Sequence, residues 1–323
     1  HSGAARAEYF EVSDFMLNES FMSTVWSAAP TPLDWHGQLD LEAVKKLADH
    51  HERLGIRGVF IGGTAGEGPL LPRRMLLELA RATVAASAGR MATALQITDN
   101  SAERMIENIR YFADAKVDLF VIAPPFMCLQ PTQGHLFEMY RKVIAASPLP
   151  VGIYHRGKDA TVEIAPETIA RLAALPNVVT LKDSACTEAD TRAIIAARDM
   201  LRGRKPFFAY SGNEFDCVGA ARTGYDGMMI GGACFNGRMA KAVFELARNG
   251  QIDEATALQE RLNELMYDCF GGRSINCWLA GEKQVMVELG IFQTPLCLMN
   301  YQLTPECSAA IRRAIVREAE WLH

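Results

Sequence analysis

A lysine stands at the end of a run of apolar, β-branched residues, in the stretch "VVTLKDS" at 178–184. The run has the composition of a buried strand, and Lys182 and Asp183 follow it. Such a lysine is either a solvated strand end, with Asp183 as its ion-pair partner, or an amine kept partly dry for chemistry. An unprotonated amine attacks a ketone to form an imine, and burial disfavours the charged form of an amine. The stretch therefore raises Schiff-base chemistry as a hypothesis.

A tyrosine stands at the matching place one strand earlier. The run "VGIYH" at 151–155 ends in Tyr154 and His155, one strand-plus-helix unit before Lys182. If the strands are parallel neighbours, the tyrosine and lysine side chains can converge at one edge of the sheet. A phenol hydroxyl beside an imine can move protons to and from the substrate oxygen. The pair predicts enamine chemistry that makes or breaks a carbon–carbon bond; otherwise Tyr154 is a packing residue.

A glycine-rich turn, "GGTAGEG" at 62–68, follows another apolar run. Its backbone N–H groups can hold a carboxylate, as similar turns hold phosphate. Thr64 in such a turn often bonds only its own backbone. Glu67 is expected to cap the next helix or to bridge to another loop. Together with the lysine and the tyrosine, the turn indicates a site for a 2-oxo acid.

Apolar runs alternate with amphipathic segments along much of the chain. This order predicts a (β/α)₈ barrel; a doubly wound open sheet is the alternative, but no run is followed by a G-x-G-x-x-G turn. Asp40 and Asn100 are expected helix caps, and Pro166 is expected in a first helical turn. The expected strands are 26–32, 58–63, 93–97, 119–125, 151–155, 178–183, 207–212 and 226–232.

The strand signal stops after Phe235, and only helical patterns follow. We therefore expect an N-terminal arm or tag remnant over residues 1–22, the barrel over 23–235 and a C-terminal helical extension over 236–323. In a parallel barrel, chemistry takes place at the carboxyl ends of the strands, which is where the lysine, the tyrosine and the glycine-rich turn fall.

Composition narrows the class of protein. The 323 residues carry a formal net charge of −5, and no Lys/Arg run has the form of a phosphate-tracking stripe, so nucleic acid is not an expected partner. No apolar run approaches the length of a membrane span, and the opening residues lack the order of a signal peptide. The eight cysteines form no metal-binding pattern, which argues against zinc and favours a reducing cytoplasm.

The ordered set of motifs resembles the dihydrodipicolinate synthase/N-acetylneuraminate lyase superfamily of class I, pyruvate-dependent aldolases. The resemblance rests on "APTPLD", "GTAGEG", "IYH" and "LKDS" and covers roughly residues 24–320. It implies that Lys182 forms the Schiff base, that Tyr154 transfers protons and that Thr64 belongs to the proton relay. It also implies that the Thr64–Ala65 backbone holds the carboxylate of a pyruvate-type 2-oxo acid, with an aldehyde as the second partner. No metal or other cofactor is implied, and the usual assembly is a homotetramer.

Further substrate contacts follow from the same resemblance. Asn213 and Glu214 of "SGNE" fall where neuraminate lyases bind the hydroxyls of a polyhydroxy chain, but they can equally cap the helix that follows. Ile230, at the end of the last apolar run, is also an expected substrate-binding residue. His155 is either a substrate contact or a satisfied histidine at the rim.

Three positions depart from the family's pattern. Ala65 replaces a hydroxyl residue, Phe126 replaces a second relay tyrosine, and Asp159 stands where the synthases have a carboxylate-binding arginine, although Arg156 and Lys158 are close in sequence. The last two departures disfavour dihydrodipicolinate synthase itself.

Three hypotheses of function follow. The first is a Schiff-base lyase that cleaves or forms a carbon–carbon bond between pyruvate and an aldehyde, on a sugar-derived or hydroxylated 2-oxo acid. The second is a dehydratase of a deoxy-keto sugar acid that uses the same lysine imine. The third, of another class, is a non-catalytic barrel that binds a 2-oxo acid.

Overall fold

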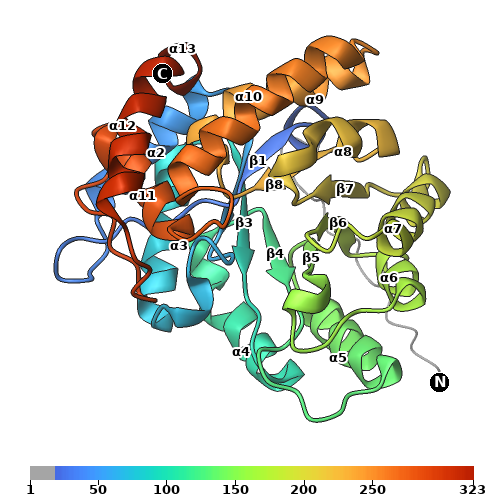
Figure 1. The fold of residues 1–323 in the computed structure, drawn as a ribbon. Coiled ribbons are helices and arrows are strands. Elements are labelled where there is room, and N and C mark those ends of the chain that lie inside the picture. Colours follow the sequence, from blue (N-terminus) through green and yellow to red (C-terminus); the bar gives the residue numbers. More distant parts are fainter. Residues whose placement is uncertain (1–18) are drawn as a thin grey trace, which may run out of the picture.

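Eight parallel strands close into a barrel at the centre of the computed structural model, which describes residues 19–323 (Figure 1). The order of the strands around the barrel follows the chain, and β1 pairs with β8 to close it. The predicted (β/α)₈ barrel is therefore confirmed. The strands are β1 (Val25–Ser27), β2 (Gly58–Ile61), β3 (Ala92–Gln96), β4 (Leu119–Ile122), β5 (Val151–His155), β6 (Val178–Asp183), β7 (Phe208–Ser211) and β8 (Gly227–Ile230).

A helix follows each strand. These eight helices are α2 (Leu41–Arg53), α3 (Arg73–Ser87), α4 (Ala102–Tyr111), α5 (Gln133–Ala146), α6 (Pro166–Ala173), α7 (Glu188–Leu201), α8 (Cys217–Thr223) and α9 (Ala233–Arg248). The boundary predicted at residue 235 falls inside α9. The chain then continues through α10 (Ile252–Phe270), α11 (Trp278–Glu288), α12 (Pro305–Arg317) and α13 (Ala319–Leu322), which gather at one side of the barrel (Figure 1).

Two of the three residues that were predicted to mark helix starts do so in the structure. The side chain of Asp40 accepts a hydrogen bond from the Ala43 amide at 3.0 Å, and Pro166 is the first residue of α6. Asn100 is not the cap of α4: Ser101 takes that role, because the side chain of Asn100 instead accepts the amide of Met127 in a neighbouring loop at 2.9 Å.

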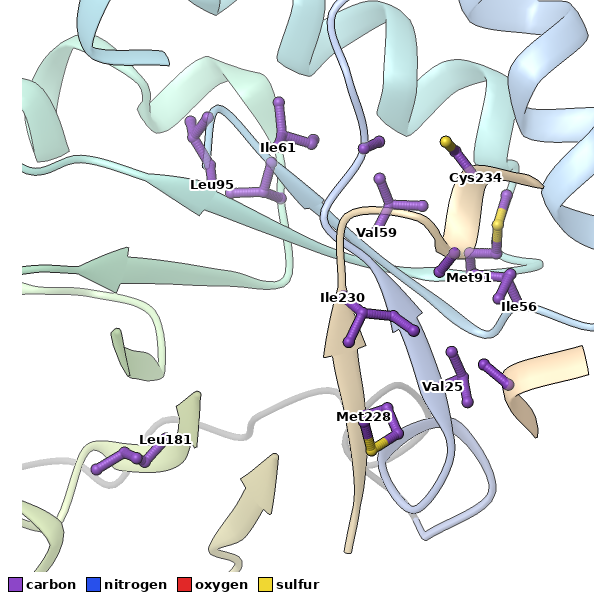
Figure 2. Packing of buried hydrophobic residues seen from close by; sticks show 14 of the residues in the cluster. Val25, Ile56, Val59, Ile61, Met91, Leu95, Leu181, Met228, Ile230 and Cys234 are labelled. Carbon is purple, nitrogen blue, oxygen red and sulfur yellow. The ribbon is translucent and has the colours of Figure 1, made fainter. Parts of the chain in front are cut away.

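The strands separate two apolar layers, because successive side chains of a strand point to opposite faces. The outward layer packs against the helices, and Figure 2 shows Val59, Leu95 and Ile230 in it. The inward layer fills the barrel with large aromatic side chains that include Trp26 and Phe60.

Helix α1 (Glu19–Met22) covers the bottom of the barrel, at the amino ends of the strands. The Tyr210 hydroxyl donates to the Met22 carbonyl at 2.6 Å, and the Trp26 indole donates to the Phe21 carbonyl at 2.9 Å. Of the arm predicted over residues 1–22, residues 1–18 lie outside the described part of the chain. These contacts and the inward aromatic side chains fill the barrel at the amino ends of the strands. Space for a large cavity is therefore left at the carboxyl ends.

Candidate active site at the mouth of the barrel

Lys182 is the inward side chain near the end of β6. Leu181, the residue before it, points outward into the apolar layer (Figure 2), so strand alternation turns Lys182 into the barrel. The lysine is only 7% exposed. Its Nζ lies 4.5 Å from the centre of the Tyr154 ring and 5.5 Å from that of Phe60. Among residues 19–323, no carboxylate forms an ion pair with this amine.

Asp183, the alternative partner of that lysine, points the other way. Its Oδ1 accepts the amides of Ala185 and Cys186, and its Oδ2 accepts the Tyr225 hydroxyl at 2.6 Å. The aspartate is completely buried in this network. Its role is therefore to shape the loop after β6, and the interpretation of Lys182 as a strand end paired with Asp183 is wrong.

Tyr154 and Thr64 meet beside the lysine. The two hydroxyl oxygens lie 3.2 Å apart, and β5 pairs with β6 so that Tyr154 stands directly beside Lys182. Burial alone would raise the pKa of Tyr154, but the charge of Lys182 and hydrogen bonds to Thr64 and Ser184 outweigh it and lower that pKa below its ordinary value. A phenol with a lowered pKa exchanges protons more readily, which suits a proton relay.

The glycine-rich turn after β2 has a tightly determined backbone. Gly62 has a φ of +69°, and a Cβ on Gly68 would lie 2.0 Å from the Gly62 carbonyl oxygen, so neither position tolerates a side chain. The Thr31 hydroxyl donates to the Gly66 carbonyl at 2.6 Å. The turn therefore presents Thr64 and Ala65 in a fixed position.

Glu67 anchors this turn to the C-terminal helices. Its carboxylate accepts the Lys283 ammonium at 2.6 Å and the Leu298 amide at 2.6 Å, and Lys283 also donates to the Leu296 carbonyl at 2.7 Å. Both charged side chains are buried. The expectation that Glu67 bridges to another loop is confirmed.

A cavity of about 510 Å³ opens at the carboxyl ends of the strands, a size typical of small-molecule sites. It brings together Lys182, Tyr154, Thr64, Ala65 and Glu214. The other residues that line it are Ala28, Arg156, Asp159, Ser184, Gly212, Phe215, Gly231, Phe270, Ile275, Trp278 and Tyr301.

Asn213 and Glu214 have different roles. The Asn213 side chain accepts the Phe215 amide at 3.2 Å and caps a short 3₁₀ turn, so it does not face the cavity. The Glu214 carboxyl lines the cavity and accepts the Gly232 amide at 2.9 Å. Burial raises the pKa of Glu214 to about 7, although the Gly232 amide and Lys182 oppose the increase.

Two expected substrate contacts are not at the cavity. Ile230 points outward into the apolar layer (Figure 2), and its carbonyl already accepts the Ala28 amide at 2.9 Å; the next residue, Gly231, lines the cavity instead. His155 follows Tyr154 and therefore points away from the barrel. It is buried, with its Nε2 3.3 Å from Asp190 Oδ2 and without hydrogen-bond geometry. Ile230 and His155 are therefore not substrate contacts, because the alternation of side chains along a strand turns both away from the cavity.

Several lining residues were not predicted as site residues. Ser184 lies two positions after Lys182, and this spacing in "LKDS" could have indicated that both side chains face the cavity. Arg156 supplies a positive charge beside the negative Asp159. Trp278 and Tyr301 come from the C-terminal extension and pack edge to face with ring centres 5.4 Å apart. Helical patterns alone give no indication that this extension folds back over the mouth.

The arrangement matches a known family along most of the chain. The model of the dihydrodipicolinate synthetase family matches residues 21–312. The chain belongs to this family. Relatives named 4-hydroxy-tetrahydrodipicolinate synthase include one from Herminiimonas arsenicoxydans, 28% identical over 89% of this chain and 95% of the relative. Another, from Saccharophagus degradans, is 29% identical over 77% of this chain and 82% of the relative.

Solved structures agree with the assignment. Dihydrodipicolinate synthase from Bacteroides thetaiotaomicron is 25% identical with a TM-score of 0.81, over 92% of this chain and 98% of its own. A monomeric dihydrodipicolinate synthase variant is 20% identical with a TM-score of 0.82, over 96% and 99%. CdNal from Clostridium difficile, solved with mannosamine, is 18% identical with a TM-score of 0.81, over 91% and 98%. The last two show the fold alone.

Members of the family are class I lyases that act through a pyruvate Schiff base, and this chain is an enzyme of that class. The hypothesis of a non-catalytic 2-oxo-acid-binding barrel is therefore not retained. In the described chain, no helix combines the length and apolar character that a membrane span requires.

Replacing Thr64 tests the electrostatics of Tyr154. We expect Thr64→Val to raise the pKa of Tyr154, because the substitution removes a hydrogen bond that lowers it. Titration of Tyr154 by NMR, with ¹³C at the phenol carbon, measures the shift. Thr223→Val, which removes a hydroxyl bonded only within α8, is the control and leaves the titration unchanged. A titration of Tyr154 that is identical in Thr64→Val and the control would contradict this account.

The ion pair under the turn gives a prediction of stability. Glu67→Gln leaves the buried Lys283 without its counter-charge, and we expect a loss of about 3–5 kcal/mol in the free energy of unfolding. Denaturant unfolding measures it. Glu264→Gln breaks the solvent-exposed pair with Arg273 and is expected to change stability little. Equal effects of the two substitutions would show that the buried pair does not hold the fold.

Proposed function

We propose that this enzyme is an aldolase that releases or adds pyruvate, with Lys182 as its Schiff-base residue and a sugar-derived or hydroxylated 2-oxo acid as its substrate. The observation that carries the proposal is the surroundings of Lys182. It is a buried amine without an ion-pair partner in the described chain, packed against the Tyr154 ring in a cavity at the mouth of the barrel. No carboxylate of residues 19–323 forms an ion pair with this amine in competition with the substrate ketone.

The chemistry of cleavage proceeds in balanced steps. Nζ of Lys182 attacks C2 of the substrate, and loss of water gives an iminium ion. The electrons of the C3–C4 bond then move toward the iminium nitrogen as the C4 hydroxyl loses its proton, which yields an aldehyde and an enamine. The enamine takes up a proton on C3, and water hydrolyses the imine to free pyruvate and the lysine.

In this proposal, Tyr154 carries out the proton transfers at C2. Its hydroxyl is held by Thr64 at 3.2 Å, and its ring lies over the lysine amine. Removing such a positioned acid–base group costs about 10²–10⁴ in rate. The backbone of Thr64 and Ala65, in the rigid turn that also lines the cavity, is the proposed site for the carboxylate of the 2-oxo acid.

The polar groups of the cavity support a hydroxyl-bearing substrate. Asp159 and Glu214 offer carboxyl oxygens that accept hydrogen bonds from hydroxyl groups, the Asp159 carboxylate repels a second carboxylate, and Arg156 supplies one positive charge. Phe126 lies in an adjoining cavity with Thr64 and Tyr154 and has no hydroxyl to extend a relay. We therefore disfavour the synthase reaction named for the relatives, which share 26–29% of their residues with this chain.

A dehydratase of a deoxy-keto sugar acid is the second candidate. It is supported by Glu214, because burial raises the pKa of this residue to about 7 and a protonated carboxyl can donate to a leaving hydroxyl. Analysis of the products from candidate sugar acids separates the two reactions. Free pyruvate indicates the aldolase, whereas loss of water without pyruvate indicates the dehydratase.

Trapping the imine tests the role of Lys182. The protein is incubated with pyruvate, reduced with borohydride and mapped by peptide mass spectrometry, and we expect one adduct, on Lys182. Lys205 is an internal control: burial lowers its pKa to about 8, but its amine is bound by the carbonyls of Leu175 and Val178, away from the cavity. Equal labelling of Lys205 and Lys182, or no adduct on Lys182, would refute the assignment.

We further propose a cytoplasmic homotetramer. The loop after β4 exposes a run of apolar side chains, with Phe126 36%, Met127 64% and Leu129 90% exposed, which supports burial against a second copy. Leu129→Asp is expected to reduce the mass measured by light scattering toward that of the 35.6 kDa chain. Val316→Asp, on an 80% exposed position of α12, leaves the mass unchanged. A monomeric wild-type protein would refute the tetramer.

A further inference from the structure

Glu282 is a buried carboxyl that the proposed reaction does not use. It lies in α11 and is completely shielded from solvent. Its Oε1 accepts only the weak thiol donor of Cys234 at 3.5 Å, and its Oε2 has no hydrogen-bond partner in the described chain. The ammonium of the adjacent Lys283 is bound to Glu67 and the Leu296 carbonyl and forms no ion pair with Glu282. An ionised carboxylate in such a place is costly.

The unpartnered oxygen points at the wall of the substrate cavity. A Cβ on Gly231 would lie 3.4 Å from Glu282 Oε2 and 3.7 Å from the Ala65 Cβ. Gly231 and Ala65 both line the cavity, whereas Glu282 stands behind them. The approach is close because neither lining residue has a side chain beyond Cβ. The corner formed by Ala65 and Gly231 is therefore separated from the Glu282 carboxyl only by the wall itself.

Glu214 lies on the other side of two adjacent glycines, Gly231 and Gly232. Its Oε2 accepts the Gly232 amide at 2.9 Å, and a Cβ on Gly232 would lie 2.5 Å from that oxygen. Gly231 and Gly232 thus separate two carboxyls, the partly exposed one of Glu214 within the cavity and the fully buried one of Glu282 behind its wall. Because Glu282 has no access to solvent, a negative charge on Glu214 makes a second negative charge on Glu282 unfavourable.

The electrostatics agree with this geometry. Burial and the repulsion of Glu214 raise the pKa of Glu282 to about 8, although the Cys234 thiol and the charges of Lys283 and Lys182 oppose the increase, and burial raises the pKa of Glu214 to about 7. The Gly232 amide favours the ionised form of Glu214, whereas no backbone amide in the described chain donates to Glu282, so Glu282 keeps its proton to the higher pH. The other titratable or charged groups around the pair are Cys234 of α9, the Glu67–Lys283 pair, Cys297, and Asp216 and Cys217 of the loop after β7.

We infer that Glu282 controls the binding of the substrate's carboxylate: a 2-oxo acid binds at the Ala65–Gly231 corner while Glu282 is protonated and is repelled once Glu282 ionises. The inference rests on the proposed function, which places that carboxylate at the Thr64–Ala65 backbone. Below about pH 8 the group behind the wall is neutral and binding is intact. Above that pH it is negative, and the affinity for the 2-oxo acid falls.

Pyruvate binding as a function of pH tests the inference. The apparent Kd is measured from the extent of borohydride trapping on Lys182, for wild type, Glu282→Gln and Glu214→Gln, from about pH 6 to about pH 9.5. Glu288→Gln, at the far end of the same helix, is the matched control. The same series with pyruvamide, a ketone that lacks the carboxylate, isolates effects on the Lys182 amine.

We expect the wild-type Kd for pyruvate to rise about 5- to 150-fold above pH 8, the range of ordinary coupling between two sites. In Glu282→Gln, whose amide is always neutral, the rise is absent. In Glu214→Gln the rise begins at lower pH, because the repulsion that helped Glu282 keep its proton is gone. Glu288→Gln follows wild type, and pyruvamide shows no rise in any variant.

Three results would overturn the inference. Equal pH responses in wild type and Glu282→Gln would remove Glu282 from the effect, and an equal response with pyruvamide would assign the effect to the amine. Should Glu282→Gln fail to fold, a rise in Glu214→Gln that begins at the wild-type pH has the same consequence. In these cases the adduct on Lys182 still forms and the proposed function stands. Absence of any adduct would overturn both.

Discussion

The alternation of side chains along short parallel strands decides which groups of this barrel can react with each other. Along β6, Leu181 and Asp183 face the helices and Lys182 faces the interior. The register of β5 and β6 sets Tyr154 directly beside Lys182 and leaves His155 on the outer side. The amine thus has aromatic rings around it, while the nearest carboxylate in sequence is used to shape a loop.

The mouth of the barrel contains two different arrangements of ionisable groups: an ion pair and a pair of carboxyls. Glu67 and Lys283 neutralise each other at 2.6 Å and use their remaining hydrogen bonds to hold the backbone at Leu296 and Leu298. In the described chain, neither Glu214 nor Glu282 has a cation at ion-pair distance, and the pKa of each carboxyl is raised. The first arrangement holds the turn to the C-terminal helices, and the second makes the local charge responsive near neutral pH.

Much of the fold and part of the site could be predicted from sequence. Apolar runs and their spacing indicate the barrel, and Lys182 and Tyr154 follow because each ends a recognisable strand. Ile230 and His155 were misplaced because a one-residue step reverses the direction of a side chain, and sequence spacing does not specify where the alternation begins. Glu282 could not be identified, since a glutamate in a helical pattern reads as solvent-facing and only tertiary packing buries it.

The ion pair at the mouth also determines the order in which the site can be completed during synthesis. Glu67 and Lys283 are 216 residues apart in the chain, and the Leu298 amide that Glu67 accepts lies still further on. A ribosome therefore releases the glycine-rich turn long before the helix that secures it. Contacts of such long range form late, and they slow folding. A nascent chain that already contains all eight strands still lacks the residues that secure this turn, so the mouth is completed only after α11 and Leu298 have been synthesised.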